Sequence, residues 1–199
     1  MTRVLISGIA LLVCLYFAIA QCFAGDLGDR VVANSQKYLR VRERTGHNDN
    51  PWIDYWAKSV GLDNKAQFQR TGTGYSWCMI FVHGVYEETA EQCRIKNPMP
   101  RAAGVQIVWS IARADELRYK TIDADDLLAG VERGEAGDVL IMLHKNGLGH
   151  TEIVRSQYRA ELNTCGGNTN QAGSREGDGV YNKTRQITSI AGLIRPKGL

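Results

Sequence analysis

The chain has 199 residues, of which 44% are hydrophobic, and a formal net charge of +3. This length allows one globular domain with a sizeable core, and neither an internal repeat nor a Pro/Gly/Ser-rich linker divides it. Because the excess of positive charge is small and the basic residues are scattered, the composition argues against nucleic acid as a partner.

The N-terminal segment predicts export. Arg3 is followed by an uncharged, mostly apolar run over residues 4–20, and the first acidic residue is Asp26. A basic start, an apolar middle and small residues before a cleavage point are typical of a secretory signal peptide. The run is also near the length of a membrane span, but no basic flank follows it to stop transfer. We therefore expect a signal peptide at 1–24, a single domain at 25–199, secretion to the periplasm or the extracellular space, and no stable membrane insertion after cleavage.

The chain after the expected cleavage point begins with helices, because apolar residues recur there at intervals of three and four. Pro51 suits the first turn of one of them, where a missing backbone N–H has no cost. The expected helices of this kind cover approximately residues 26–41, 51–56, 102–114 and 125–131.

A further helix is expected to begin with Trp77 and Cys78 and to run to about Glu91. Its start lies within the most informative segment of the chain, residues 74–82. Ser76 is a good N-cap residue, and Trp77 begins an apolar stripe that anchors one face. A thiol in the first turn lies at the positive end of the helix dipole, which favours the thiolate. Cys78 is therefore a candidate nucleophile.

The C-terminal part changes to a period of two, which predicts short strands separated by Gly- or Asn-rich turns. Helices followed by consecutive strands indicate an α+β fold with an antiparallel sheet. The expected strands cover residues 138–143, 150–156, 161–165, 180–187 and 191–195.

Two polar residues of this strand region complete a pattern with Cys78. His150 stands at the head of a predicted strand, and Asn168 follows 18 residues later in a Gly-Gly-Asn-Thr segment. A cysteine, then a histidine, then a polar residue that orients the histidine is the order found in thiol hydrolases.

Several segments together resemble the CHAP family, the cysteine- and histidine-dependent amidohydrolases and peptidases of the NlpC/P60 papain-like superfamily. The resemblance implies a papain-like CHAP fold, with N-terminal helices packed on an antiparallel sheet of about five or six strands. It also implies cleavage of amide bonds in bacterial cell-wall peptidoglycan. The matching segments are residues 42–49, 74–82, 134–140, 149–154, 167–180 and 192–196.

The resemblance assigns roles to residues at matching positions. Cys78 is expected to attack the carbonyl carbon, and His150 is expected to act as its base. Many relatives carry an acidic residue at the position of Gly166, and its absence here leaves Asn168 as the residue expected to orient His150.

The substrate is expected to be peptidoglycan, cut either at the N-acetylmuramoyl–L-alanine bond or inside the stem peptide or crossbridge. Tyr75, Trp77, Glu43 and Asn48 are the expected substrate-binding residues. The alternative is a non-catalytic peptidoglycan-binding module on the same scaffold, in which the missing acid at Gly166 reflects a loss of chemistry. The sequence gives no information on an inhibitor or immunity protein as a partner.

Two further expectations concern a disulfide between Cys93 and Cys165 and the binding of metal ions. In an oxidising compartment the simplest arrangement is a Cys93–Cys165 disulfide with Cys78 left free, and the alternative is that both are reduced. No two cysteines or histidines show zinc-ligand spacing, and the oxygen ligands around Asp178 are too sparse for a calcium loop. We therefore expect no metal and no cofactor.

Overall fold

The structure is a computed structural model that describes residues 27–171 and 177–197, so the expected signal peptide lies outside the described residues. The described helices are α2 (Leu27–Gln36), α3 (Pro51–Ser59), α4 (Asn64–Thr71), α5 (Cys78–Cys93), α6 (Val105–Ala114) and α7 (Ala124–Leu128). The strands are β1 (Tyr119–Asp123), β2 (Val139–Leu143), β3 (Gly149–Tyr158), β4 (Glu161–Thr169), β5 (Gly179–Gln186) and β6 (Gly192–Pro196). Within these ranges, no helix combines the length and the apolar character needed to cross a membrane.

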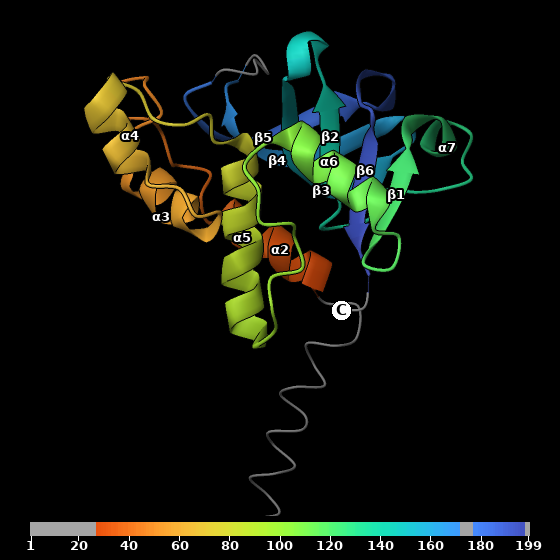
Figure 1. Cartoon of the computed structure of the whole chain (residues 1–199). Coiled ribbons are helices and arrows are strands. Elements are labelled where there is room, and N and C mark those ends of the chain that lie inside the picture. Colours follow the sequence, from red (N-terminus) through yellow and green to blue (C-terminus); the bar gives the residue numbers. More distant parts are fainter. Residues whose placement is uncertain (1–26, 172–176, 198–199) are drawn as a thin grey trace, which may run out of the picture.

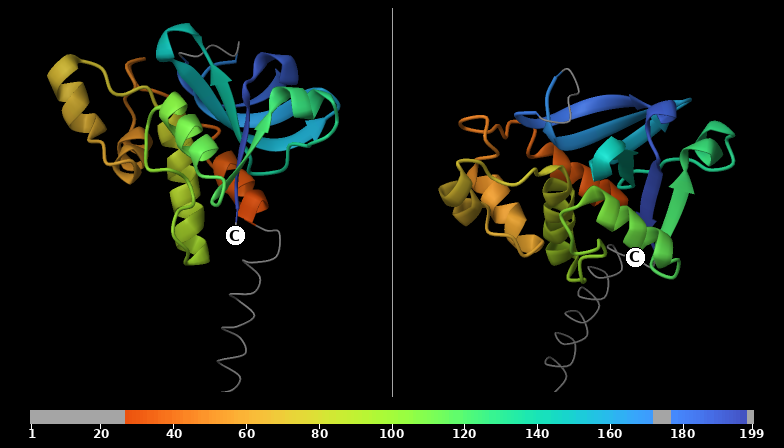
Figure 2. Two further views of the ribbon diagram at one scale, coloured as in Figure 1. Left: turned by 45° about the vertical axis from the view of Figure 1, so that its right-hand side comes forward. Right: turned by 45° about the horizontal axis from the view of Figure 1, so that its top comes forward.

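The strands form one antiparallel sheet of six strands in the order β1-β6-β2-β3-β4-β5. Helices α2, α5 and α6 pack against this sheet, whereas α3 and α4 lie further out, with α3 packed against α5 (Figures 1 and 2). The expected α+β architecture, with N-terminal helices on an antiparallel sheet, is confirmed.

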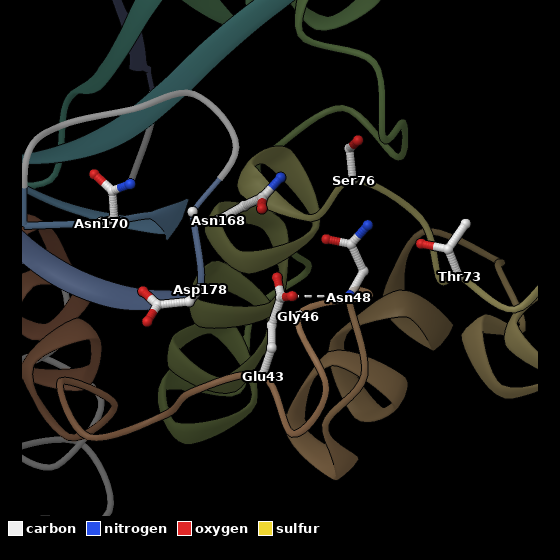
Figure 3. A pocket seen from close by; sticks show the side chains of 9 residues that line it. Glu43, Gly46, Asn48, Thr73, Ser76, Asn168, Asn170 and Asp178 are labelled. Atoms are coloured by element: carbon white, nitrogen blue, oxygen red, sulfur yellow. Dashed lines mark hydrogen bonds between the residues drawn. The ribbon is translucent and has the colours of Figure 1, made fainter.

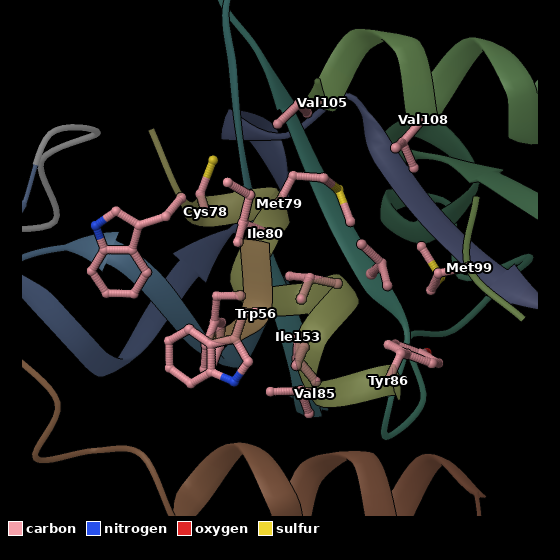
Figure 4. Close-up of a cluster of buried hydrophobic side chains, with 14 of the residues drawn as sticks. Trp56, Cys78, Met79, Ile80, Val85, Tyr86, Met99, Val105, Val108 and Ile153 are labelled. Atoms are coloured by element: carbon pink, nitrogen blue, oxygen red, sulfur yellow. The ribbon is translucent and has the colours of Figure 1, made fainter. Parts of the chain in front are cut away.

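Helix α5 lies at the centre of the core (Figure 4). Its residues 78–86 are all buried, because it contacts α2 and α3 as well as strands β3 and β4. A helix that is covered on all sides has no polar face, which explains why this segment is apolar almost throughout. Trp56 of α3 and Trp77, which precedes α5, stack with ring centroids 6.1 Å apart and fix the start of the helix against its neighbour.

The contact between α3 and α5 depends on a glycine. A Cβ atom on Gly84 would lie 2.3 Å from Cδ1 of Trp56, so the indole packs directly on the backbone of α5. Gly84→Ala is expected to lower the free energy of unfolding by about 1–3 kcal/mol, because a buried indole has no room to move. Urea denaturation measures this, with Ser110→Ala at an exposed position of α6 as the matched control. A Gly84→Ala variant as stable as the control would contradict this packing.

Two elements were not predicted from the sequence. Helix α4 is poor in apolar residues and is defined by its ends: Asp63 accepts a hydrogen bond from Ala66 N, and Gly72 ends the helix with φ of 76°. Strand β1 is an edge strand that pairs only with β6. The predicted N-cap of α5 was wrong by one residue, because Trp77 occupies that position and Ser76 precedes it.

The expected Cys93–Cys165 disulfide is not formed within the described part of the chain. Cys165 lies in β4, fully buried, with its thiol 3.7 Å from the carbonyl oxygen of Ser35 in α2, whereas Cys93 is the last residue of α5. Burial in this environment raises the pKa of the Cys165 thiol to about 12, so it is protonated at neutral pH. Cys165 is therefore a packing residue of the interface between α2 and the sheet.

Candidate active site

Cys78 is the first residue of α5, and its side chain is 6% exposed. No side chain of the described residues caps this end of the helix. The N–H groups of the first helical turn have no partner inside the helix, and the helix dipole gives this end a partial positive charge. The first turn of α5, to which Cys78 belongs, therefore offers backbone donors that can stabilise negative charge.

His150 is the second residue of β3 and is 1% exposed. Its Nε2 lies 3.1 Å from Oε1 of Glu152, two residues further along the same strand. Its Nδ1 is buried and makes no hydrogen bond that meets ordinary geometric criteria with any described residue. Since Nε2 is engaged by Glu152, Nδ1 is the ring nitrogen available to Cys78.

The charges around His150 favour the imidazolium ion. Burial by itself would lower the pKa of His150, but the contacts of the ring with Cys78 and Glu152 outweigh it and raise the pKa to about 9. The ring is therefore protonated at neutral pH, so that it can pair with a thiolate at Cys78 and can donate a proton.

Glu152 is held by groups from the two neighbouring strands. Its side chain is fully buried, and its carboxylate accepts hydrogen bonds from Arg185 of β5 and from the hydroxyl of Thr164 in β4. Burial would raise the pKa of Glu152, but His150 and Arg185 together lower it below the ordinary value. The carboxylate is thus ionised and shared between two cations.

The expected pairing of Asn168 with His150 is therefore wrong. The partner of the ring is Glu152, and Asn168 lies instead on the wall of a groove near the start of α5 (Figure 3). Asn168 is 4% exposed and has φ of 54°, a left-handed conformation that asparagine tolerates better than most residues. Its position at the irregular end of β4 sets the shape of the groove.

The groove beside the start of α5 has a volume of about 610 Å³ and polar walls. Two of the expected substrate-binding residues, Glu43 and Asn48, do line it. In Figure 3 both side chains lie on the same side of the groove, where Oε2 of Glu43 accepts a hydrogen bond from the backbone N–H of Asn48. Among the residues that the structure describes, the lining consists of Glu43, Gly46, Asn48, Thr73, Ser76, Asn168, Asn170, Gly177 and Asp178.

The other two expected substrate-binding residues do not line this groove. Trp77 is fully buried in the core, and its Nε1 donates a hydrogen bond of 2.8 Å to Oε1 of Glu43. Tyr75 is half-buried and packs against the same core. Trp77 thus acts on the groove only indirectly, by fixing the carboxylate of Glu43.

Glu152 and Arg185 are the residues that sequence reasoning missed. One signal was available, because His150 and Glu152 are two residues apart on a strand and so point to the same face of the sheet. Arg185 gave no such signal, since its contact with Glu152 depends on the pairing of β4 with β5.

In the described ranges, no group of three or more His, Cys, Asp and Glu side chains is arranged to hold a metal ion. Cys78 is the first residue of α5, and the buried pair of His150 and Glu152 comes from β3.

No protein-family model and no curated protein matches the chain. Among solved structures, it is similar to the NlpC/p60 domain of the peptidoglycan hydrolase SagA, with a TM-score of 0.40 and 13% identity over 84% of this chain and 97% of that one. It is also similar to the wild-type endolysin LysIME-EF1, with a TM-score of 0.43 and 19% identity over 72% of this chain and 62% of that one. At these levels neither relative assigns a family or a reaction to the chain, and membership of the CHAP family stays a prediction.

Proposed function

We propose that the protein is an exported hydrolase that cleaves amide bonds of bacterial peptidoglycan with Cys78 as the nucleophile. The observation that carries the proposal is the position of Cys78 at the uncapped start of α5, in contact with a buried histidine whose charged form is stabilised. A thiolate, a proton donor and free backbone N–H groups are the groups that amide hydrolysis through a thioester requires.

The reaction has two steps. The Cys78 thiolate attacks the carbonyl carbon, and His150 gives its proton to the amine as the C–N bond breaks, which leaves a thioester on Cys78. Neutral His150 then takes a proton from water, and the water oxygen attacks the thioester carbon. The C–S bond breaks, which releases the carboxylic acid and restores the Cys78 thiolate beside protonated His150. The backbone N–H of Cys78, in the first turn of α5, is the proposed donor to the developing oxyanion, and one such donor contributes about 3 kcal/mol to the barrier reduction.

The choice of peptidoglycan rests on the sequence. Residues 74–82 and 149–154 carry the resemblance to CHAP enzymes, and they hold the proposed nucleophile and base. The polar groove lined by Ser76, two residues before Cys78, suits a peptide, because its walls offer amide and carboxylate groups for hydrogen bonding. The pattern of residues 1–24 favours export to the compartment where this polymer lies.

The alternative, a non-catalytic binding module, rested on the absence of an acid at position 166. That reason is weakened, because Glu152 places a buried carboxylate 3.1 Å from the imidazole. A site kept only for binding has no need of a buried carboxylate shared between a histidine and an arginine, since burying such charges is costly.

Digestion of purified peptidoglycan by the full-length protein, with mass spectrometry of the released fragments, tests the proposal. Glycan strands freed of whole peptides would indicate an amidase, and shortened peptides would indicate an endopeptidase. If the protein binds the polymer but releases no fragment that is absent from a buffer control, the binding-module alternative holds and the proposal is wrong.

The pH dependence of the reaction is a separate prediction. Because the leaving amine takes its proton from His150, kcat/KM for a soluble muropeptide is expected to fall as pH rises through about 9. The protonated ring is the form that donates the proton, and its fraction falls as pH rises above the pKa of His150. Activity is therefore lost on the basic side. A basic limb centred near the ordinary histidine pKa of about 6.5 would contradict the arrangement described for His150.

A further inference from the structure

Glu152 occupies the space next to Gly166. Ile153 of β3 pairs with Cys165 of β4 in an antiparallel register, so Glu152 and Gly166 are neighbours across the two strands. A Cβ atom on Gly166 would lie 2.6 Å from Cγ of Glu152 and 3.0 Å from both Cδ and Oε1. The Glu152 side chain thus lies across the place that a side chain at position 166 would fill.

Hydrogen bonds to both oxygens hold the Glu152 carboxylate in a single orientation. Oε1 is shared by His150 and Arg185, while Oε2 accepts hydrogen bonds from Thr164 and from Nε of Arg185. Both oxygens are therefore fully used, and the side chain is buried. A carboxylate held in this way cannot rotate without leaving buried charged groups unpaired, which makes it a rigid partner for the imidazole.

We propose that Glu152 is the positioning residue of His150 and that Gly166 is required beside it because it has no side chain. The inference rests on the proposed function and specifies which residue orients the base. The carboxylate at position 152 and the missing side chain at position 166 are then one feature, because the acid on β3 lies in the space that the glycine on β4 leaves open.

The geometry requires that the residue at position 166 has no side chain. Its replacement by alanine adds only a methyl group, with no charge and no hydrogen-bonding capacity, yet that methyl group meets the part of Glu152 that holds the carboxylate against the ring. If Glu152 positions His150, this change on the neighbouring strand has to alter the pKa of His150 in the same direction as removal of the carboxylate does.

The first test is the titration of His150 by NMR in the full-length protein, a readout that does not depend on activity. In Glu152→Gln the pKa of His150 is expected to fall by about 1 unit or more from the wild-type value, because the neighbouring negative charge is lost. In Gly166→Ala it is expected to fall in the same direction by a smaller amount. Asn163→Ala, a partly exposed substitution in the same strand β4, is the matched control and is expected to leave the titration unchanged.

The second test is kinetic, with a soluble muropeptide. Glu152→Gln is expected to reduce kcat by about 10²- to 10⁴-fold with KM changed less than about 3-fold, because the ring loses its orientation and not its substrate. Gly166→Ala is expected to reduce kcat by about 10-fold or more and to move the basic limb to lower pH. In Glu152→Gly, adding Gly166→Glu is expected to recover part of kcat, which a merely structural role of Glu152 would not produce.

The outcomes separate the two proposals. Wild-type titration of His150 in folded Glu152→Gln, or in folded Gly166→Ala, would overturn the inference about these residues. If fragments are released in a Cys78-dependent manner while Glu152→Gln keeps the wild-type kcat, the inference fails and the proposed function stands. If the wild type releases no fragments, the proposed function fails and the NMR titration alone decides whether Glu152 and Gly166 position the ring.

Discussion

Replacement of Cys78 by alanine is expected to lower the rate of peptidoglycan fragment release by at least about 10³-fold, because no other group can form the thioester. His150→Ala is expected to cause a loss of similar size, since the imidazole both pairs with the thiolate and protonates the leaving amine. The two losses should not add in the double variant, because the residues act as one unit. Rates of release of soluble fragments measure all three variants.

Cys93→Ala is the matched control for this series. It removes a thiol from the same helix at its other end, remote from His150, and is expected to keep the wild-type rate. Urea denaturation of each variant checks that the fold persists. A folded Cys78→Ala protein that releases fragments at the wild-type rate would rule out the thioester mechanism.

Arg185→Met is expected to have the largest effect on stability. Among the described residues, the substitution leaves the buried Glu152 carboxylate with His150 and Thr164 as partners, and loss of one member of a buried ion pair costs about 3–5 kcal/mol. The free energy of unfolding from urea denaturation is the measurement. Because the penalty comes from the stranded charge, Arg185→Met/Glu152→Gln is expected to recover much of the loss.

An exposed ion pair provides the control for Arg185. Arg113 pairs with Asp123 at 3.1 Å, but both side chains are about half exposed, so Arg113→Met is expected to cost less than about 1 kcal/mol. Equal effects of the two Arg→Met substitutions would mean that the Glu152 site is no more sensitive than an ordinary surface contact.

Much of the fold could be predicted because burial leaves a periodic trace in the sequence. Helices α2, α3, α5 and α6 and strands β2 to β6 were expected near their observed positions, since each presents apolar residues at the spacing of its element. Helix α4 and strand β1 left no such trace. The first is defined by its capping residues, and the second is an edge strand of five residues in which only Tyr119 and Ile122 are buried, so it lacks a period of two.

The candidate site could be predicted only where local sequence determines it. Cys78 and His150 stand at the starts of a helix and a strand, which their neighbours indicate. The role of Glu152 depends on Arg185, a residue 33 positions away that becomes its neighbour only when the sheet forms. The sequence offered two roles for Trp77, a platform for substrate and an anchor in the core. Its ring is fully buried and stacked on Trp56, so the anchoring role is confirmed.

The most direct test of the central claim is chemical modification of the unaltered active site. In a Cys93→Ser background, the protein is treated with iodoacetamide for increasing times, the alkylated fraction of Cys78 is determined by peptide mass spectrometry, and peptidoglycan fragment release is measured on the same samples. Cys165 is fully buried and serves as an internal control for unfolding. If Cys78 is the nucleophile, activity falls in direct proportion to the alkylated fraction of Cys78 while Cys165 stays unmodified. Fragment release that persists after complete alkylation of Cys78 would contradict the proposed mechanism.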